Sequence, residues 1–387
     1  MTTKPENTPD EICQLRMEVF EGPTGTAEIA NAWRLLSKEV AGPLTFFQSA
    51  SWCINWLKAH DNVRPVIVAV WHGDQLSMLM PLAEKRTLGG MALETLTGAD
   101  AEYSLPLVRN GTSITQAFSA LLDGLYAAGK WDLLQMNSVP ENHPLITLAD
   151  EANSMPAELE YSSVIELEGL GSLDDYLATR SKSTRRSLRR KMQAFEKLGQ
   201  VTCSVSPVTE ETMKSVFATI CEWKREWFVE NGVLGGNFNG REMKRHLLAF
   251  CQTDGVGEPT LASELRLDGE LVACDLMLQG DGVLYSYVTA RDLAFHTYGV
   301  GTVMDMYTIR HAIENGYKAF DLLSAPNPSK DSLSNRQIPL QDVRFPLTGK
   351  GRMMAGFDRL RLRNTLKNTF YSLPLGIRQR IVRLRKT

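Results

Sequence analysis

Two β-hairpin patterns, about half the chain apart, most constrain the fold of this 387-residue sequence. The segment RPVIVAVWHGDQLSMLMPLAEKR (64–86) joins two apolar runs through a His-Gly-Asp turn, and TLASELRLDGELVACDLMLQG (260–280) does so through Asp-Gly-Glu. Their turn glycines, Gly73 and Gly269, are 196 residues apart. Apolar, β-branched runs around a glycine turn predict hairpins. Because each hairpin follows helical segments and precedes strand–helix alternation, we expect a duplicated α/β module. Two unrelated hairpins are the alternative, since such turns are common.

Hydrophobic spacing predicts the other elements. Helices are expected at 26–40, 49–60, 114–130, 183–198, 209–232 and from the glycines near 300 to residue 315. Strands are expected at 131–139, 162–169, 282–290 and 318–324. Gly199, Gly232 and Gly316 follow predicted helices at positions typical of helix ends.

The composition describes a globular chain, with 43% hydrophobic residues and a mean hydropathy of −0.19. No apolar run approaches the roughly 20 residues that cross a bilayer, and the polar start MTTKPENTPDEICQ lacks the apolar region of a signal peptide. The six cysteines and six histidines are scattered without metal-ligand spacing. We therefore expect a cytoplasmic protein with reduced thiols and without a metal site.

The stretch FHTYGVGTVMDM (295–306) places Gly299 and Gly301 between a predicted strand and a predicted helix. A helix start presents unpaired N–H groups and the positive end of the helix dipole, so it favours anions. Glycine permits close approach because it has no Cβ. The amides of Val300, Gly301 and Thr302 are therefore predicted to bind a phosphate group. An ordinary glycine-rich turn is the alternative.

Two common phosphate-binding motifs do not fit this loop. A Rossmann site needs a third glycine where Met304 stands, and the loop lacks the Lys-Ser/Thr pair of a P-loop. The pattern H-x-x-G-x-G resembles instead the pyrophosphate loop of GNAT acetyltransferases, Gln/Arg-x-x-Gly-x-Gly/Ala, with His296 in place of Gln or Arg. The resemblance implies that acetyl-CoA or another acyl-CoA is the cosubstrate. It assigns cofactor binding to His296, Gly299, Val300, Gly301 and Thr302.

A wider resemblance covers roughly residues 45–345. The segment GYKAFDLLSAPNPSKDSLSNRQIPLQDVRFPL (316–347) resembles the end of GNAT-like proteins of bacterial cellulose and exopolysaccharide biosynthesis, and STRRSLRRKMQAFEKLG (183–199) resembles their basic helix and that of Fem-type peptidoglycan transferases. The hairpin segment LDGELVACDLML and the phrase WDLLQMNSVP (131–140) are also similar to this group. The family usually has an aromatic residue before its loop lysine, whereas Ser329 precedes Lys330 here.

This resemblance implies an α/β (α+β) fold with two tandem GNAT-like modules, whose central sheets are mixed, largely antiparallel and flanked by helices. We expect a flexible leader at 1–25, an N-terminal module at 26–160, a C-terminal acyl-CoA-binding module at 161–349 and a basic amphipathic helical tail at 350–387. The CoA-type loop occurs only in the second module.

Acyl transfer from a thioester to an amine needs a base and a hydrogen-bond donor for the thioester oxygen. Asp275 is the predicted base, because it interrupts the apolar strand VACDLML at a hairpin position where GNAT enzymes often carry a carboxylate. Burial would raise its pKa into a useful range, and a structural aspartate is the alternative. Tyr285 and Tyr287 share one face of the next strand and are candidates to orient substrate or donate a proton, or else packing residues. Alternation points Cys274 to the face opposite Asp275, which argues against a cysteine nucleophile.

Four further residues are predicted to bind substrate: Asp321, Lys330, Arg186 and Arg190. Asp321 ends an apolar strand beside the expected site, and Lys330 could hold an anionic group. A structural aspartate and a solvated lysine are the alternatives.

The formal net charge of −3 conceals two basic segments. Residues 180–191 carry seven basic side chains and no acid, and residues 350–387 carry 11 Lys and Arg against the single acid Asp358. Such patches on an acidic body predict anionic partners. The first segment could contact CoA phosphates, an anionic glycan or tRNA, or it could be only a solvated helix face. No RNA-binding motif favours tRNA. DNA is not expected as a partner.

The tail has two apolar stripes separated by Pro374: Leu362, Leu366, Phe370 and Leu373, then Ile377, Ile381 and Leu384. Basic amphipathic helices bind anionic membrane surfaces, but they also pack on their own domain. Peripheral contact with the inner membrane is therefore one expectation for the tail.

The leading function is an acyl-CoA-dependent N- or O-acyltransferase that acts on an amine, sugar or glycan precursor in cell-envelope or exopolysaccharide biosynthesis. A Fem-like aminoacyl-tRNA-dependent transferase and a non-catalytic GNAT-like module of polysaccharide machinery are the alternatives.

Overall fold

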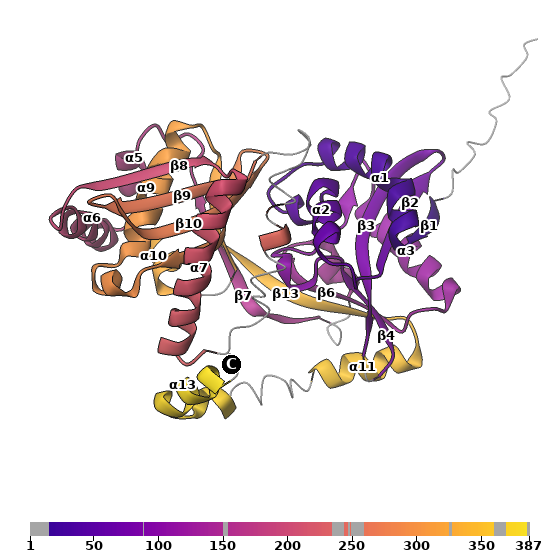
Figure 1. The fold of residues 1–387 in the computed structure, drawn as a ribbon. Coiled ribbons are helices and arrows are strands. Elements are labelled where there is room, and N and C mark those ends of the chain that lie inside the picture. The colour runs from indigo at the N-terminus through magenta and orange to yellow at the C-terminus, as the bar shows by residue number, and fades with distance from the viewer. Residues whose placement is uncertain are drawn as a thin grey trace, which may run out of the picture.

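The computed structural model describes residues 15–87, 89–149, 154–233, 244–246, 248, 259–324, 327–359 and 369–384. In Figure 1 these residues form two lobes, each a sheet with helices, joined by two long strands.

The N-terminal lobe contains the first predicted hairpin. Its strands are β1 (Leu15–Glu21), β2 (Pro65–His72), β3 (Gln75–Arg86), β4 (Met91–Thr95), β5 (Leu107–Val108) and β6 (Leu133–Pro140). Its helices are α1 (Gly22–Glu39), α2 (Ala50–Ala59), α3 (Ile114–Ala128) and α4 (Pro144–Leu148), with 3-10 turns η1 (Phe46–Gln48) and η2 (Gly98–Asp100). The hairpin predicted at 64–86 is confirmed as β2–β3.

The C-terminal lobe contains the second hairpin, which is confirmed as β9–β10. Its strands are β8 (Val201–Pro207), β9 (Leu261–Leu267), β10 (Glu270–Gly280), β11 (Val283–Arg291) and β12 (Ala319–Ser324). Its helices are α5 (Leu173–Thr179), α6 (Lys182–Glu196), α7 (Glu210–Glu230), α9 (Val300–Glu314) and α10 (Pro328–Leu333), with the 3-10 turn η3 (Leu293–Tyr298).

Two long strands, β7 (Ser154–Glu166) and β13 (Arg336–Pro346), join the lobes into one sheet. Across the described residues the order is β1-β2-β3-β4-β6-β13-β7-β12-β11-β10-β9-β8, with β5 paired to β3. Strand β13 belongs to the end of the chain, yet it pairs with β6 of the N-terminal lobe, while β7 pairs with β12 of the C-terminal lobe. The boundary expected at 160/161 therefore falls inside a shared strand.

The duplication is visible in the strand order. In each lobe an antiparallel hairpin is followed by a third antiparallel strand, then a helix, then a strand parallel to the third: β2-β3-β4-α3-β6 in one lobe and β9-β10-β11-α9-β12 in the other. The expected tandem α/β fold with a mixed, largely antiparallel sheet is confirmed.

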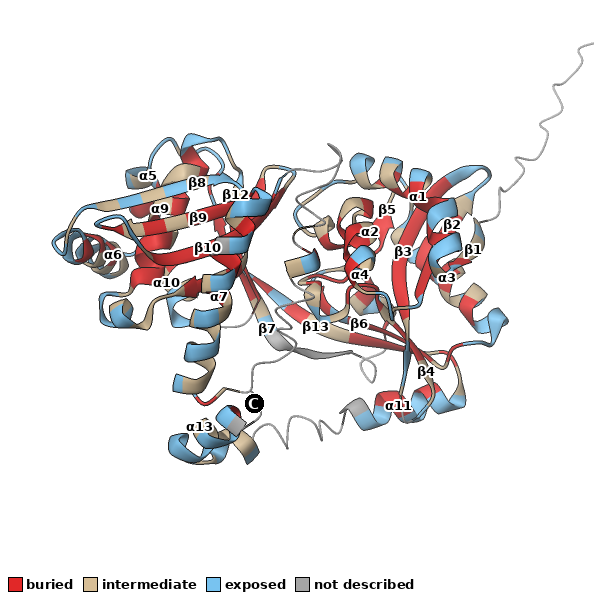
Figure 2. Ribbon diagram, in the orientation of Figure 1, coloured by how far each residue is buried: buried red, intermediate tan, exposed pale blue. Residues whose placement is uncertain are grey.

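Both faces of the sheet are covered. One core cluster contains α1, α2 and α7 side chains and spans both lobes, for example Trp33, Trp52 and Phe217. On the opposite face, α3 covers the N-terminal lobe, whereas α5, α6 and α9 cover the C-terminal lobe. Figure 2 shows buried residues along the sheet and on the inner sides of these helices. Cys274 and Leu276 belong to the α7 side, whereas Ala273 and Met277 belong to the α9 side, as alternation requires.

The expected leader at 1–25 is wrong for residues 15–25. Residues 15–21 form β1, which pairs with β2 along its whole length, and α1 begins at Gly22. The polar composition hid an edge strand whose alternate side chains pack on the lobe. Residues 1–14 lie outside the described residues.

The tail forms α11 (Gly349–Arg359) and α13 (Leu375–Leu384). The predicted stripe residues Leu362 and Leu366 lie outside the described residues. Among the described residues, no helix is long and apolar enough to cross a membrane.

Candidate active site

The predicted anion-binding loop is a helix start without a side-chain cap. Gly299 precedes α9 with φ of 67° and ψ of 40°, a left-handed conformation that glycine adopts without steric cost. Within the described part of the chain, the amides of Val300, Gly301 and Thr302 donate to no acceptor. These three residues are nevertheless buried. Buried N–H groups without acceptors are rare in proteins, so this corner is suited to an anionic ligand.

Two cationic side chains lie against the same corner. A Cβ on Gly301 would lie 3.1 Å from Nη1 of Arg291, and a Cβ on Gly299 would lie 3.4 Å from Cδ of Lys191. The Lys191 Nζ also donates to the Thr302 hydroxyl over 3.4 Å. The side chains that cover the glycines are therefore flexible cations, which would add to the attraction of the helix dipole for a diphosphate.

A split between β11 and β12 opens in the direction of this corner. Strands β11 and β12 pair in parallel only at their first three positions, from Val283 with Ala319 to Tyr285 with Asp321. Beyond these pairs β11 continues to Arg291, toward α9, while β12 keeps β7 as the partner of its other edge as far as Ser324. The far ends of β11 and β12 therefore leave backbone groups that do not pair with one another.

Asp275 lies on β10, one strand from the split, and only 1% of it is exposed. The Ser286 hydroxyl, on β11, donates to its Oδ2 over 2.5 Å, whereas its Oδ1 has no partner in the described structure. Burial raises the pKa of Asp275 to about 7, and hydrogen bonds from Ser286 and Thr289 partly oppose that rise. A carboxyl group with this pKa and one free oxygen can accept a proton near neutral pH.

Three charged groups interact electrostatically with Asp275, and of these only Lys330 was singled out from the sequence. Burial, followed by the charge of Asp275, raises the pKa of Asp305 on α9 to about 7. Burial lowers the pKa of Lys224 on α7, and the charge of Asp275 opposes that fall. Burial also lowers the pKa of Lys330, although four carboxylates act in the opposite direction. The helical spacing of α7 and α9 gave no signal for Lys224 or Asp305, because their partners are distant in sequence.

Asp321 lies at the junction of the two lobes rather than free in a substrate pocket. It accepts hydrogen bonds from the Tyr103 hydroxyl (2.6 Å), the Ser162 hydroxyl (2.9 Å) and the Leu323 amide (2.8 Å). Burial raises its pKa to about 6, and the Tyr103 hydrogen bond is the largest opposing effect. Asp321 therefore has hydrogen-bond donors from the loop of Tyr103, from β7 and from its own strand β12.

Lys330 lies between this junction and Asp275. Its ammonium donates to the carbonyl oxygens of Ser324 (2.8 Å) and Leu323 (3.3 Å), and Glu102 accepts hydrogen bonds from the amide and hydroxyl of Ser324. Asp275 and Asp321 both influence its pKa. Lys330 is thus close to the expected site, but its ammonium is already hydrogen-bonded to backbone carbonyl oxygens at the end of β12.

The two tyrosines point to the face of the sheet opposite Asp275. The Tyr285 hydroxyl donates to the Pro43 carbonyl oxygen (2.9 Å), and its ring lies 5.0 Å from that of Phe46. Tyr287 lies in a β-bulge, 5.4 Å from the Trp52 ring, and its buried hydroxyl has no partner among the described residues. The expectation that both share one face is confirmed, whereas the structure does not bring them to Asp275.

The other predicted binding residues are exposed. His296 lies in η3 and is exposed, although its carbonyl oxygen accepts the Gly299 amide. Arg186 and Arg190 line a shallow hollow on α6 together with Lys182. The face of α6 that contains Lys191 adjoins the glycine corner, so the exposed arginines lie on a different face of the same helix.

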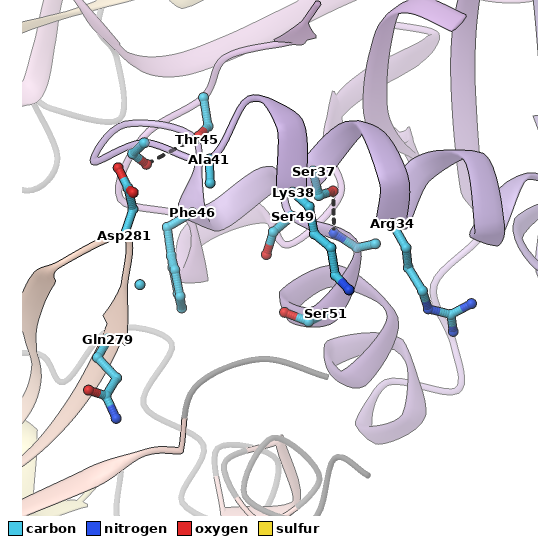
Figure 3. A pocket seen from close by; sticks show the side chains of 13 residues that line it. Arg34, Ser37, Lys38, Ala41, Thr45, Phe46, Ser49, Ser51, Gln279 and Asp281 are labelled. Atoms are coloured by element: carbon cyan, nitrogen blue, oxygen red, sulfur yellow. Dashed lines mark hydrogen bonds between the residues drawn. The ribbon is translucent and has the colours of Figure 1, made fainter. Parts of the chain in front are cut away.

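A separate cavity of about 240 Å³ lies between the lobes (Figure 3). Phe46 forms an apolar wall, Arg34 and Lys38 from α1 lie at one side, and Gln279 and Asp281 come from the C-terminal lobe. Along β10, Gln279 is four residues from Asp275, or about 13 Å. The cavity therefore lies apart from Asp275, and none of the glycine-corner residues lines it.

The described residues hold no group of three or more His, Cys, Asp or Glu arranged to bind a metal ion.

Comparisons with known proteins agree with this geometry. Residues 182–331 match the model of the acetyltransferase (GNAT) domain, a stretch that includes α6, Asp275, the glycine corner and Lys330. No curated protein matches the chain.

Three solved structures have a similar fold at low sequence identity. FemX is 11% identical, with a TM-score of 0.55, over 83% of this chain and 96% of that chain. The C-terminal domain of a proposed lysylphosphatidylglycerol synthetase from Agrobacterium fabrum is 11% identical, with a TM-score of 0.53, over 87% and 97%. A conserved protein of unknown function from Bacteroides thetaiotaomicron is 13% identical, with a TM-score of 0.52, over 82% and 97%. These likenesses show that the whole two-lobed fold recurs.

Proposed function

We propose that this protein transfers an acyl group from acyl-CoA to an amine or hydroxyl of a sugar, glycan precursor or other small acceptor. The observation that carries the proposal is the start of α9, where three amides without acceptors adjoin Lys191 and Arg291. This corner lies inside the stretch that matches the GNAT acetyltransferase domain. The glycan setting rests on the resemblance of residues 183–199 and 316–347 to proteins of exopolysaccharide biosynthesis.

In this proposal the residues of the corner hold the diphosphate of CoA. The amides of residues 300–302 supply hydrogen bonds, and the two cations supply charge. The group attached to the diphosphate would extend along the split between β11 and β12 toward β10. When bound, acyl-CoA supplies an activated acyl group as a thioester.

Asp275 is the residue that would take the proton of the acceptor. Its free Oδ1 and its pKa of about 7 suit a base that works near neutral pH. Ser286 holds Oδ2 and so fixes the orientation of the carboxyl group. Lys224 and Lys330 favour the ionised form of Asp275, which keeps the base available.

Isothermal titration calorimetry with CoA, acetyl-CoA and longer acyl-CoAs tests the proposal. We expect saturable binding that Gly301→Glu abolishes, because the new carboxylate would enter the space of the Arg291 guanidinium and repel phosphate. Gly356→Glu is the matched control, since Gly356 lies in α11 and a Cβ there has no neighbour within 4 Å. Absence of binding by every CoA compound would overturn the proposal and favour a non-catalytic scaffold.

A second candidate is transfer from aminoacyl-tRNA, which the exposed stripe of Lys182, Arg186 and Arg190 on α6 favours. These three residues form no ion pair with another described residue. Binding of tRNA that weakens steeply with salt, and that fails when Arg186 and Arg190 are both changed to Gln, would support it. Gly301→Glu should leave tRNA binding intact, which separates the two candidates.

A further inference from the structure

Helices α11 and α13 carry an unusual share of the exposed apolar side chains of this protein. Nine large hydrophobic side chains are strongly exposed among the described residues, and five of them lie on these two helices. They are Met353 (65%), Phe357 (60%), Leu375 (47%), Ile377 (46%) and Ile381 (36%). Single exposed apolar residues are ordinary, whereas a concentration of them marks an interaction surface.

Each helix presents a pair of apolar residues on one face, whereas Leu375 lies at the start of α13 beside Gly232. Met353 and Phe357 are four residues apart on α11, and Ile377 and Ile381 are four apart on α13, so each pair is adjacent on its helix surface. Other faces hold the helices in place. Met354 of α11 is buried with Ala92 and Leu133 of the N-terminal lobe.

Helix α13 is anchored to the other lobe. Its Gln379 side chain donates to the Glu230 carbonyl oxygen at the end of α7 over 2.9 Å, and its Val382 is only 2% exposed. The apolar pair Ile377 and Ile381 is thus left outward although the helix is docked. Figure 1 shows α11 and α13 along the same lower side of the molecule, one beneath each lobe.

Positive charge accompanies the exposed apolar residues. Lys350 and Arg352 of α11 and Arg380 and Arg383 of α13 are exposed, and none forms an ion pair with another described residue. The sequence from 350 to 387 contains one acid, Asp358. Apolar side chains interspersed with unpaired cations fit the interface of an anionic bilayer, where the apolar groups enter the acyl boundary and the cations meet lipid phosphates.

We propose that α11 and α13 together form a docking surface for an anionic lipid bilayer. The two helices lie along one side of the protein in Figure 1, and a deformable lipid surface can meet their separate patches without shape complementarity. This surface is distinct from the glycine corner and does not depend on the proposed transferase activity.

Co-sedimentation of the full-length protein with lipid vesicles tests this inference. Vesicles of equal parts phosphatidylglycerol and phosphatidylcholine should bind the protein, and pure phosphatidylcholine vesicles should bind it at least tenfold more weakly. Raising the salt concentration should release it, because screening weakens charge attraction at exposed surfaces.

Two pairs of substitutions identify the surface. Phe357→Gln with Ile381→Gln, and separately Arg380→Gln with Arg383→Gln, should each weaken vesicle binding about tenfold or more. Leu35→Gln is the control for the first pair, since Leu35 is 69% exposed on α1. Lys182→Gln with Arg186→Gln is the control for the second pair, because it removes the same charge from α6.

Three results would overturn the inference. The first is no binding to anionic vesicles at any salt concentration. The second is binding that only the α6 control pair weakens. The third is a dimer in light scattering that Phe357→Gln with Ile381→Gln converts to a monomer, which would make the surface an interface between copies of this chain. Thermal unfolding of each variant confirms that the fold is retained.

Discussion

The two lobes repeat one strand order but differ at the helix that follows their third strand. In the C-terminal lobe, α9 starts at a left-handed glycine without a side-chain cap, and Lys191 and Arg291 lie beside it. In the N-terminal lobe, the Ser113 side chain caps α3 by accepting from the Gln116 amide. Arg109, in the preceding loop, is occupied by Glu39 and by the Leu76 carbonyl oxygen. One helix start thus has amides without acceptors beside two cations, and the other is capped by its own serine.

The hairpins show the same difference. Asp275 lies six residues after its turn glycine, and Leu79 has the same sequence offset in the first hairpin, although it packs with α1 and α2 on the sheet face opposite that of Asp275. Leu79 is fully buried among apolar side chains, whereas Asp275 is buried beside Ser286 and two lysines. The comparison teaches that the shared hairpin does not require a carboxylate, because an apolar residue stands at the same sequence offset in the first copy.

Asp275→Asn should have the largest effect on activity. Because Asn cannot accept the proton, we expect turnover of acyl-CoA with an acceptor to fall roughly 10²- to 10⁴-fold, with unchanged affinity for acyl-CoA. A thiol-release assay and calorimetry measure the two quantities. If Asp275→Asn retained full turnover, the chemical asymmetry of the two hairpins would be without catalytic meaning.

Leu79→Asp introduces a carboxylate at the same sequence offset in the first hairpin, in the apolar cluster with α1 and α2. We expect the free energy of unfolding to fall by about 3–5 kcal/mol, because no partner there compensates a buried charge. Leu79→Met is the control and should cost less than about 1.5 kcal/mol. Urea denaturation measures both, and equal costs would show that the N-terminal lobe tolerates the charge.

The pH dependence of stability should differ between the wild type and Asp275→Asn. The folded-state pKa of about 7 lies above the ordinary value of 3.8, so the folded state retains the proton over this window and the wild type loses stability as pH rises from about 4 through 7. Relative to Asp275→Asn, we expect a loss of about 2 kcal/mol between pH 5 and pH 8. Asp305, Lys224 and Lys330 stay in both proteins. Parallel pH profiles in urea denaturation would contradict the raised pKa.

Tyr103→Phe tests the junction between the lobes. The substitution removes the hydroxyl that donates to buried Asp321, so we expect a loss of about 1–3 kcal/mol in unfolding free energy. Tyr126→Phe is the control, since the Tyr126 hydroxyl donates to the Pro346 carbonyl oxygen at an exposed site. An equal and small loss in both variants would argue against a structural role for Asp321.

Lys191→Ala should have the smallest effect. We expect acyl-CoA affinity to fall about threefold to tenfold, because one charge-assisted contact beside the corner is lost. Lys197→Ala, at the exposed end of α6, should leave the affinity unchanged. Calorimetry compares the two, and identical affinities would remove Lys191 from the anion site.

Local patterns predicted most of the secondary structure. The hairpins, the helix after Gly301 and the helix stop at Gly316 follow from apolar spacing and from glycine conformation, which depend on neighbouring residues. The same spacing correctly assigned Cys274 and Asp275 to opposite faces. It failed at β1, where a polar composition concealed a strand that only its pairing with β2 reveals.

The surroundings of the candidate site depended on tertiary structure. The glycine loop could be found from the sequence because all of its backbone donors belong to adjacent residues. Its cations Lys191 and Arg291, the Asp275 neighbours Lys224 and Asp305, and the Tyr103 donor to Asp321 come from elements that only folding brings together. The pairing of β7 with β12 and of β13 with β6 could not be predicted either, because local sequence patterns do not reveal which distant strands will pair. The sequence by itself determined the repeated module and the glycine loop of its second copy through short-range geometry, whereas the electrostatic partners were decided by long-range packing.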